Sequence, residues 1–297
     1  MKSRKIFFVI IVIVLLAVLV AAIYGLQLSF SKPQESAVGE VSKLFVTFFD
    51  VGQGDSALII TPDNYQILVD GGPDNTIAAK LGAALPFFDR DLDLVILSHP
   101  HADHVAGLVE VLNRYQVKKI IMTGVVHTAP DYLDFLKLIR DKKIPVQIID
   151  RPQELSPEEG IKLSFLWPQQ PLAEKTIDNL NNSSIAFKLI YASTSFLFTG
   201  DLEDEEALSS TTEASLLKSD VLKVGHHGSS NANDFSFLKL ASPEQAIVSV
   251  GADNDYGHPH YRTIYNLEKL GVQIWRTDRD GDISCASDGQ KAVCSGR

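Results

Sequence analysis

The stretch Ser98-His99-Pro100-His101-Ala102-Asp103-His104 decides how the rest of this sequence is interpreted. It places three of the chain's eight histidines and one aspartate directly after the apolar run 92–97. Such a run is typical of a buried strand, and in an extended segment residues two apart, such as His99 and His101, point the same way. Imidazole nitrogens and carboxylate oxygens suit zinc and similar divalent ions. The stretch therefore predicts a strand that ends at a metal site.

Other polar motifs also follow apolar runs, at Asp50, Asp70, Asp201 and His226. When several strands of a sheet end in reactive side chains, those ends are expected to meet at one edge. Seven of the eight histidines lie in three places, 99/101/104, 226/227 and 258/260. His127 stands apart, and we expect it to be structural or on the surface.

The order of apolar runs and amphipathic segments predicts the fold class. Predicted strands alternate with predicted helices from residue 43 to the end, including one acidic helix over 204–217. We therefore expect an α/β (α+β) body in which two sheets are covered by helices.

The N-terminus has the pattern of a membrane anchor. Residues 6–30 contain no charged side chain, and a basic tip with Lys2, Arg4 and Lys5 precedes them. This predicts a single transmembrane helix over 6–30, with residues 1–5 in the cytoplasm and 31–42 as a linker. A domain over 43–297 would then lie outside the cytoplasmic membrane. A cleavable signal peptide is the alternative.

The net charge limits the classes of substrate that fit this chain, and the cysteine content bears on the compartment in which it folds. The net charge is −10, which argues against a broad basic surface for nucleic acid, although a phosphodiester held by metal ions stays compatible. Cys285 and Cys294 flank a predicted turn near the C-terminus. Outside the cytoplasm they could pair across a hairpin, and two free thiols are the alternative.

Several motifs together resemble the metallo-β-lactamase superfamily: Asp70-Gly71-Gly72, His99-x-His101-x-Asp103-His104 and Thr199-Gly200-Asp201. More narrowly, 49–56 (FDVGQGDS), 222–229 (LKVGHHGS) and 256–260 (YGHPH) resemble the C-terminal hydrolase domain of ComEC-type competence DNA-uptake proteins. The resemblance covers about residues 43–284. It implies a four-layer αββα sandwich with a metal site at its edge. We expect a single anchor in place of the multi-spanning channel of the uptake proteins, so the resemblance does not imply DNA transport.

The same resemblance implies roles for individual residues. Two divalent ions are expected, zinc first and manganese as the alternative. His99 and His101 would bind the first ion, Asp103, His104 and a later histidine the second, and Asp201 would bridge them. We favour His226 over His227 as that later histidine, with His258 as a further candidate for ligand or substrate contact. Catalytic roles are expected for Asp103, His227 and His258. The expected supporting or substrate-contacting residues are Asp50, Asp70, Asn182, Ser184 and Lys223.

One departure from the superfamily pattern concerns the first ion. Many members supply a third histidine between the main motif and the bridging aspartate, where this chain has Asn181-Asn182-Ser183-Ser184. Amide oxygens are weak zinc ligands, so we expect a loosely held first ion or manganese there. Asn182 and Ser184 would otherwise contact substrate, or form a plain turn.

These inferences predict a membrane-anchored, extracytoplasmic, metal-dependent hydrolase that uses metal-activated water. The favoured substrates are phosphodiesters, either DNA, with a single strand preferred, or a cell-envelope polymer such as one bearing phosphocholine. The alternatives are a lactonase or β-lactamase-like hydrolase, and a non-catalytic metal-binding module of an uptake or envelope complex.

Overall fold

The computed structural model describes residues 43–296, which lie within one compact unit of the chain. The predicted basic tip, anchor and linker lie outside the described residues. Among residues 43–296, no helix is both long and apolar enough to cross a membrane.

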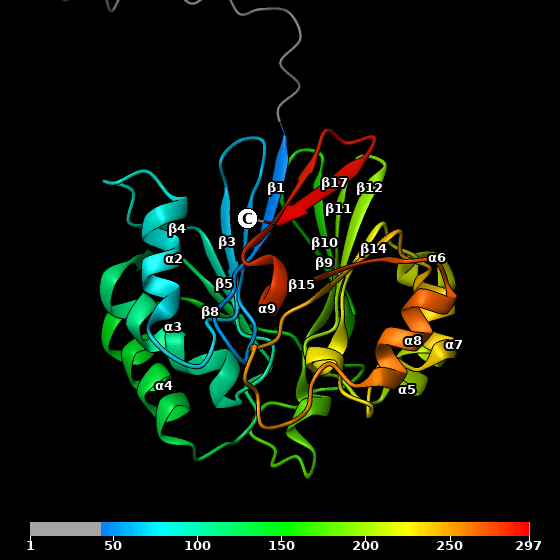
Figure 1. Cartoon of the computed structure of the whole chain (residues 1–297). Coiled ribbons are helices and arrows are strands. Elements are labelled where there is room, and N and C mark those ends of the chain that lie inside the picture. Colours follow the sequence, from blue (N-terminus) through cyan, green and yellow to red (C-terminus); the bar gives the residue numbers. More distant parts are fainter. Residues whose placement is uncertain (1–42, 297) are drawn as a thin grey trace, which may run out of the picture. The chain divides into compact units, whose positions relative to one another are not determined.

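Two large sheets form the centre of this body (Figure 1). The first sheet has eight strands, in the order β17 (Ala292–Gly296), β16 (Ile283–Ser287), β1 (Leu44–Phe48), β2 (Ala57–Ile60), β3 (Gln66–Val69), β5 (Leu94–Ile96), β7 (Ile120–Met122) and β8 (Val146–Ile148). Strands from β17 to β3 pair antiparallel, and strands from β3 to β8 pair parallel.

The second sheet has seven strands, in the order β15 (Gln273–Arg276), β14 (Gln245–Val248), β13 (Val221–Lys223), β12 (Thr194–Phe198), β11 (Ala186–Tyr191), β10 (Ile161–Trp167) and β9 (Gln153–Glu158). Here β12 to β15 are parallel and β9 to β12 antiparallel. A small separate pair joins β4 (Asp91–Leu92) to β6 (Gln116–Val117).

Helices cover the outer face of each sheet (Figure 1). The first sheet carries α2 (Thr76–Ala84), α3 (Ala102–Arg114) and α4 (Pro130–Lys142), and the second carries α5 (Glu205–Thr211), α6 (Ala214–Leu217), α7 (Phe235–Ala241) and α8 (Tyr261–Lys269). The short α9 (Thr277–Asp280) connects β15 to β16, and single 3-10 turns form η1 (Leu180–Ser183) and η2 (Gly225–Gly228).

Period-two alternation along the strands produces these layers. In β2, Leu58 packs under the helices and Ile59 packs between the sheets, and Leu197 and Phe198 of β12 divide in the same way. Between the sheets, the rings of Phe187 and Phe198 stack with centroids 4.7 Å apart. The predicted αββα sandwich is confirmed for the described residues.

The structure differs from the sequence-based elements in several places. The acidic helix predicted over 204–217 is two helices, because Thr212 is extended and the Thr211 hydroxyl donates to the Ala207 carbonyl at 2.7 Å. A threonine that bonds to the backbone in this way competes with helix continuation. Two further elements were not predicted: the edge strand β9, which contains Pro157, and the single turn α9.

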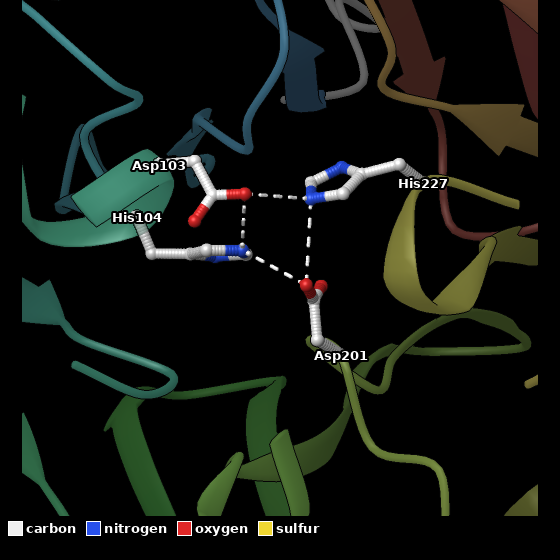
Figure 2. Close-up of side chains that lie close together, drawn as sticks. All are labelled: Asp103, His104, Asp201 and His227. Atoms are coloured by element: carbon white, nitrogen blue, oxygen red, sulfur yellow. Dashed lines mark hydrogen bonds and ion pairs between the residues drawn. The ribbon is translucent and has the colours of Figure 1, made fainter. Parts of the chain in front are cut away.

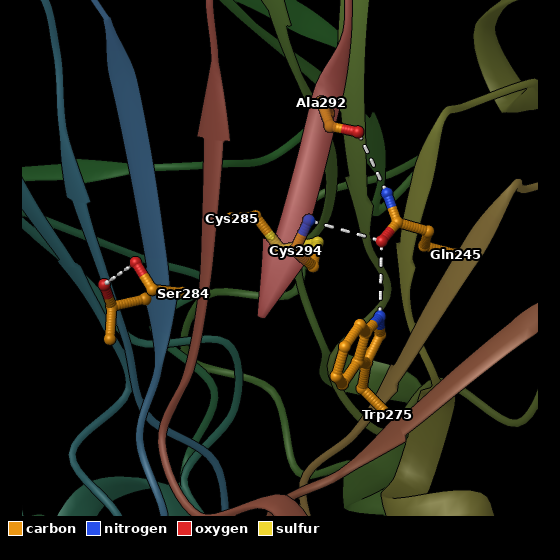
Figure 3. The surroundings of a disulfide bond; sticks show 7 residues. Gln245, Trp275, Ser284, Cys285, Ala292 and Cys294 are labelled. Atoms are coloured by element: carbon orange, nitrogen blue, oxygen red, sulfur yellow. Dashed lines mark hydrogen bonds between the residues drawn. A yellow bond between two sulfur atoms is a disulfide. The ribbon is translucent and has the colours of Figure 1, made fainter. Parts of the chain in front are cut away.

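The C-terminal hairpin carries the two cysteines opposite each other (Figure 3). Cys285 of β16 and Cys294 of β17 form a disulfide. The Gln245 side chain of the second sheet donates to the Ala292 carbonyl and accepts from the Cys294 amide and the Trp275 indole. The hairpin is thus bound to the second sheet by hydrogen bonds as well as by its strand pairing in the first.

Candidate metal centre

Four side chains from three separate segments converge at one edge of the sandwich (Figure 2). Asp103 and His104 lie in the first turn of α3, Asp201 follows β12, and His227 follows β13. His227 Nε2 lies 3.1 Å from Asp103 Oδ2 and 3.4 Å from Asp201 Oδ2, and His104 Nε2 lies 3.3 Å from Asp201 Oδ2. One ligand atom of each residue lies within 4.8 Å of the others.

These four residues fit a divalent cation. His104 Nε2 and Asp201 Oδ1 are buried and have no hydrogen-bond partner within the described residues. Buried polar atoms of this kind need a partner, and two nitrogens with two carboxylates are a donor set that suits zinc, manganese or iron. A cation among the four would satisfy these atoms.

His99 and His101 form a second group of histidines near Asp201, outside the four-residue cluster. His99 is 1% exposed, and its Nε2 lies 4.0 Å from Asp201 Oδ2 and 2.9 Å from His101 Nδ1. His127, from the loop after β7, brings its ring to 6.4 Å from the His101 ring. Asp201 Oδ2 is therefore close to a histidine of each group, and the predicted bridging role of Asp201 stays a prediction.

The backbone at 226–228 decides which later histidine enters the four-residue cluster. His226, His227 and Gly228 all have positive φ, of 47°, 52° and 82°. In this turn His226 Nδ1 lies 3.1 Å from Glu203 Oε1, while His227 points to Asp103. The structure thus places His227 in the cluster, contrary to the sequence-based preference for His226. His226 stays at the edge, with its Nε2 3.8 Å from Asp201 Oδ2.

Hydrogen bonds on the far side of each ring orient the histidines. Asp70 Oδ2 lies 2.9 Å from His104 Nδ1, and the Asp70 carboxylate accepts from the Ser98 amide and hydroxyl at 2.7 and 2.6 Å. His227 Nδ1 donates to the Ser249 carbonyl at 3.0 Å. Both bonds leave Nε2 free as the ligand atom, which is the usual arrangement around metal-binding histidines.

A buried ion pair beneath the cluster was missed in the sequence analysis. Asp55, at the end of the 50–55 turn, pairs with Lys223, which is only 4% exposed. Asp55 Oδ1 also lies 3.3 Å from His227 Nδ1, and the Asp55 amide donates to the Asp103 carbonyl at 3.1 Å. Lys223 was predicted to support the site or to contact substrate, and its pairing with Asp55 fits the supporting role. The sequence feature that could have revealed this ion pair is a lysine at the end of an apolar strand, because a lysine is rarely buried unless it is paired.

Mutual attraction sets the charges within this cluster. Burial opposes ionisation of Asp201, but His227 and His104 outweigh it and hold its pKa well below the usual range. Burial likewise opposes protonation of His104 and His227, while Asp201 and neighbouring carboxylates raise both pKa values. For Asp55, burial raises the pKa, but Lys223, His227 and His104 together outweigh burial and lower it. Without an ion the site therefore holds protons that a cation would displace.

The residues of the asparagine segment, 181–184, make contacts that differ from those predicted. The Asn182 side chain accepts from the Glu203 and Asp204 amides at 3.1 and 3.0 Å, and so caps a turn. Ser184 Oγ accepts from the Asp201 amide at 3.0 Å and positions that aspartate. It is Asn181 that faces the metal site, with a buried Oδ1 that has no hydrogen-bond partner within the described residues.

Asp50 lies outside the cluster. Its carboxylate accepts from the Gly52 amide at 3.2 Å, and its own amide donates to Asp282 at 2.8 Å. The structure therefore places Asp50 as a turn-stabilising residue of the 50–55 loop, and not among the groups that contact His104 or His227.

An open pocket of about 350 Å³ gives access to the cluster. Its lining combines the three cluster segments with side chains from three other segments: Gln53, His101, Ala102, Asp103, Asn181, Asp201, His226, His227, Tyr256 and His258. Burial, together with His227 and His226, lowers the pKa of His258 to about 4. His258 is therefore neutral at pH 7.

Known proteins share this fold and these motifs. The chain is 29% identical over 273 residues to ComE operon protein 3 of Bacillus subtilis, which covers 86% of this chain and 34% of that protein. It is 30% identical over 244 residues to competence protein ComA of Neisseria gonorrhoeae, covering 80% of this chain and 31% of that protein. The chain thus spans about a third of the length of these curated relatives.

Among solved structures, the metallo-β-lactamase fold protein YhfI of Bacillus subtilis superposes with a TM-score of 0.52 at 15% identity, covering 85% of this chain and 100% of that one. This likeness shows the fold. The profile of the metallo-β-lactamase superfamily matches residues 49–252. With its αββα layers and its His/Asp cluster at the edge, the chain belongs to the metallo-β-lactamase superfamily, and its similarity to ComEC-type competence proteins is confirmed.

Proposed function

We propose that this chain is a metal-dependent phosphodiesterase that acts on single-stranded DNA at the outer side of the cytoplasmic membrane. The observation that carries the proposal is the cluster of Asp103, His104, Asp201 and His227 at the base of an open pocket. Metallo-β-lactamase-fold proteins are generally metal-dependent hydrolases, and the similar curated proteins are named for competence. These names support a nucleic-acid substrate.

The chain's own residues would hold and orient the reacting groups. When bound, divalent ions polarise a phosphodiester and supply a water nucleophile at neutral pH. Asp103, His104, Asp201 and His227 would hold the tighter ion, and His99 and His101 would hold the looser one with Asp201 shared. Asn181 lines the pocket, and its buried Oδ1, which has no hydrogen-bond partner within the described residues, would accept a hydrogen bond from substrate or water or complete the looser site.

The proton for the leaving group does not come from His258. A general acid should have a pKa near the working pH, and the pKa of His258 is about 4. A cation at His227 would lower that pKa further, because like charges disfavour protonation. We therefore assign His258 to substrate contact. His227 is excluded as the acid whenever its Nε2 binds an ion.

The charge of the pocket favours a thin substrate. No lysine or arginine is among its lining residues, so a long duplex would find few partners for its phosphates there. A single strand, or a small envelope diester, would need only the ions. The non-catalytic alternative rests on the absent third histidine near His99 and His101.

The purified 297-residue chain, loaded with Mn²⁺ or Zn²⁺, tests the function. We expect hydrolysis of bis-(p-nitrophenyl) phosphate and of single-stranded DNA, with duplex DNA and choline-type diesters cut more slowly. Asp103→Ala should abolish hydrolysis, whereas Asp134→Ala, a matched control at an exposed position of α4, should retain it. Stoichiometric metal without any hydrolysis would support the non-catalytic module instead.

The membrane placement has its own test. A reporter fused at the C-terminus should be active only outside the cytoplasm, and non-reducing electrophoresis of whole-cell protein should show Cys285 and Cys294 oxidised. A cytoplasmic reporter signal would overturn the topology without touching the catalytic proposal.

A further inference from the structure

An exposed aromatic ring stands at the mouth of the metal pocket. Tyr256 is 67% exposed and is part of the pocket lining. One face of its ring stacks on the His258 ring, with centroids 5.6 Å apart and planes 22° from parallel. A large aromatic side chain left this open to water beside a binding site is a contact surface for a ligand.

The stack continues inward to the metal cluster. The His258 ring lies 6.2 Å from the His227 ring at an angle of 30°, and 5.6 Å from the His226 ring. His227 is itself one of the four cluster residues. Tyr256 is therefore the outermost ring of a row that begins at the site of hydrolysis.

The loop that carries these rings is held in place before any ligand arrives. The Asn254 side chain donates to the Gly251 and His258 carbonyls, both at 2.8 Å, and accepts from the His258 amide at 2.9 Å. The Gly251 amide donates to the Gln53 side chain at 3.2 Å. A preformed platform loses little conformational entropy on binding, which favours affinity.

Charge and shape decide what the platform accepts. Asp253 and Asp255 are exposed beside Tyr256, and the pocket lining has no lysine or arginine, so phosphates gain nothing from the protein here. Affinity must come from uncharged contacts. A quaternary ammonium group is recognised by a cage of several rings, whereas Tyr256 and His258 are near-parallel and present one flat open face. A flat face suits a nucleobase.

We propose that Tyr256, backed by His258, is a stacking platform for a nucleobase next to the phosphodiester that is cut. This deepens the proposed function, on which it rests, by making unpaired bases part of the recognised substrate. A duplex keeps its bases stacked on one another, so it cannot offer one to Tyr256 without unpairing. Sequence preference is not expected, because every base has a π-face.

Binding to hydrolysis-resistant oligonucleotides tests the platform directly. Fluorescence anisotropy would use the Mn²⁺-loaded full chain and labelled methylphosphonate oligothymidylate, together with a strand of the same backbone that lacks bases. Tyr256→Ala should weaken binding of the oligothymidylate about 10-fold, since stacking is worth about 1–3 kcal/mol per base. Tyr256→Phe keeps the ring and should stay within about twofold. The abasic strand should bind all three proteins equally weakly.

Phe88→Ala is the matched control. Phe88 is 91% exposed, but it lies in the loop after α2, where Asp89 contacts Gln66 at the start of β3, away from the site at the ends of the strands. Its removal should change neither binding nor hydrolysis. Equal losses for Tyr256→Ala and Phe88→Ala, or equal binding of base-containing and abasic strands, would overturn the platform.

The two proposals fail in different ways. Base-dependent binding by a wild-type chain that hydrolyses no diester would refute the phosphodiesterase and leave the platform standing. Hydrolysis of bis-(p-nitrophenyl) phosphate with base-independent binding would do the reverse. Displacement of oligothymidylate by glycerophosphocholine, at lower concentration than by thymidine, would show that the flat face serves choline and would refute the nucleobase proposal.

Discussion

Two groups of candidate metal ligands lie near Asp201, and these two sides of the site differ in the number of ligands and supporting hydrogen bonds that they have. On one side are Asp103, His104 and His227, and the two histidine rings are buried and held by hydrogen bonds to Asp70 and to the Ser249 carbonyl. On the other side are His99 and His101, and the sequence between His127 and Asp201 supplies no third histidine; Asn181 of that segment lines the pocket instead. Ligand count and hydrogen-bonded support set metal affinity, so the first side should hold its ion tightly and the second loosely.

The largest effect is expected when Asp201, the ligand that the two sides would share, is replaced. Asp201→Ala should abolish both sites and lower diester hydrolysis by at least about 10³-fold, because several kcal/mol of electrostatic stabilisation are lost. Metal content by elemental analysis and the hydrolysis rate would measure it, with circular dichroism to confirm folding. Retention of one tightly bound ion in this variant would show that Asp201 is not shared.

Single-histidine variants separate the two sides. His227→Ala should weaken the tighter site by at least about 10²-fold, since loss of a ligand exceeds loss of its supporting bond. His101→Ala should leave the tighter site within about threefold and remove only the looser ion. Calorimetric titration of the metal-free chain with Zn²⁺ would resolve two events. If His101→Ala abolished the tighter event, the ranking of the sides would be inverted.

The buried ion pair of Asp55 and Lys223 offers a further test of the tighter side, because Asp55 contacts the ring of His227. Lys223→Met leaves Asp55 uncompensated beside His227 and should weaken the tighter site about 10–100-fold. Competition with a chromophoric chelator would measure the loss. Lys188→Met is the matched control, since Lys188 is also buried but donates to the Ser215 carbonyl.

A double variant separates metal affinity from folding for this pair. Breaking a buried pair from one side costs about 3–5 kcal/mol of stability, and removing both charges restores much of it. Asp55→Asn with Lys223→Met should therefore regain thermal stability in EDTA without regaining metal affinity. Recovery of both would mean that the pair acts on folding alone.

The smallest expected effect is a pH dependence of the metal-free chain. The folded-state pKa of His258 is about 4 and its ordinary value is 6.5, so the unfolded chain binds the extra proton in this window. The titration of His258 therefore leaves the free energy of unfolding unchanged above pH 6.5 and lowers it as the pH falls from 6.5 toward 4. His258→Gln should show a shallower fall of Tm over that range in EDTA. Parallel curves for both proteins would contradict the lowered pKa.

Much of the scaffold could be predicted from local patterns. Period-two alternation located most strands, and the convergence of Asp70, His99, Asp103, His104 and Asp201 followed from their positions after apolar runs. The breaks near Thr212 and the strand with Pro157 were missed because side-chain-to-backbone bonds and edge-strand pairing override propensity. The anchor over 6–30 stays a prediction.

The sequence by itself determined the kinds of ligand, their order along the chain and the layered fold, because each of these depends on residue type and short-range periodicity. Only the tertiary structure decided which of His226 and His227 turns inward, since that depends on positive φ at both residues. It also decided that Lys223 and Asp55 pair beneath the site, that Asn181 and not Asn182 faces the pocket, and that Tyr256 stacks on His258. These are contacts between segments far apart in sequence, and no local pattern encodes their distances.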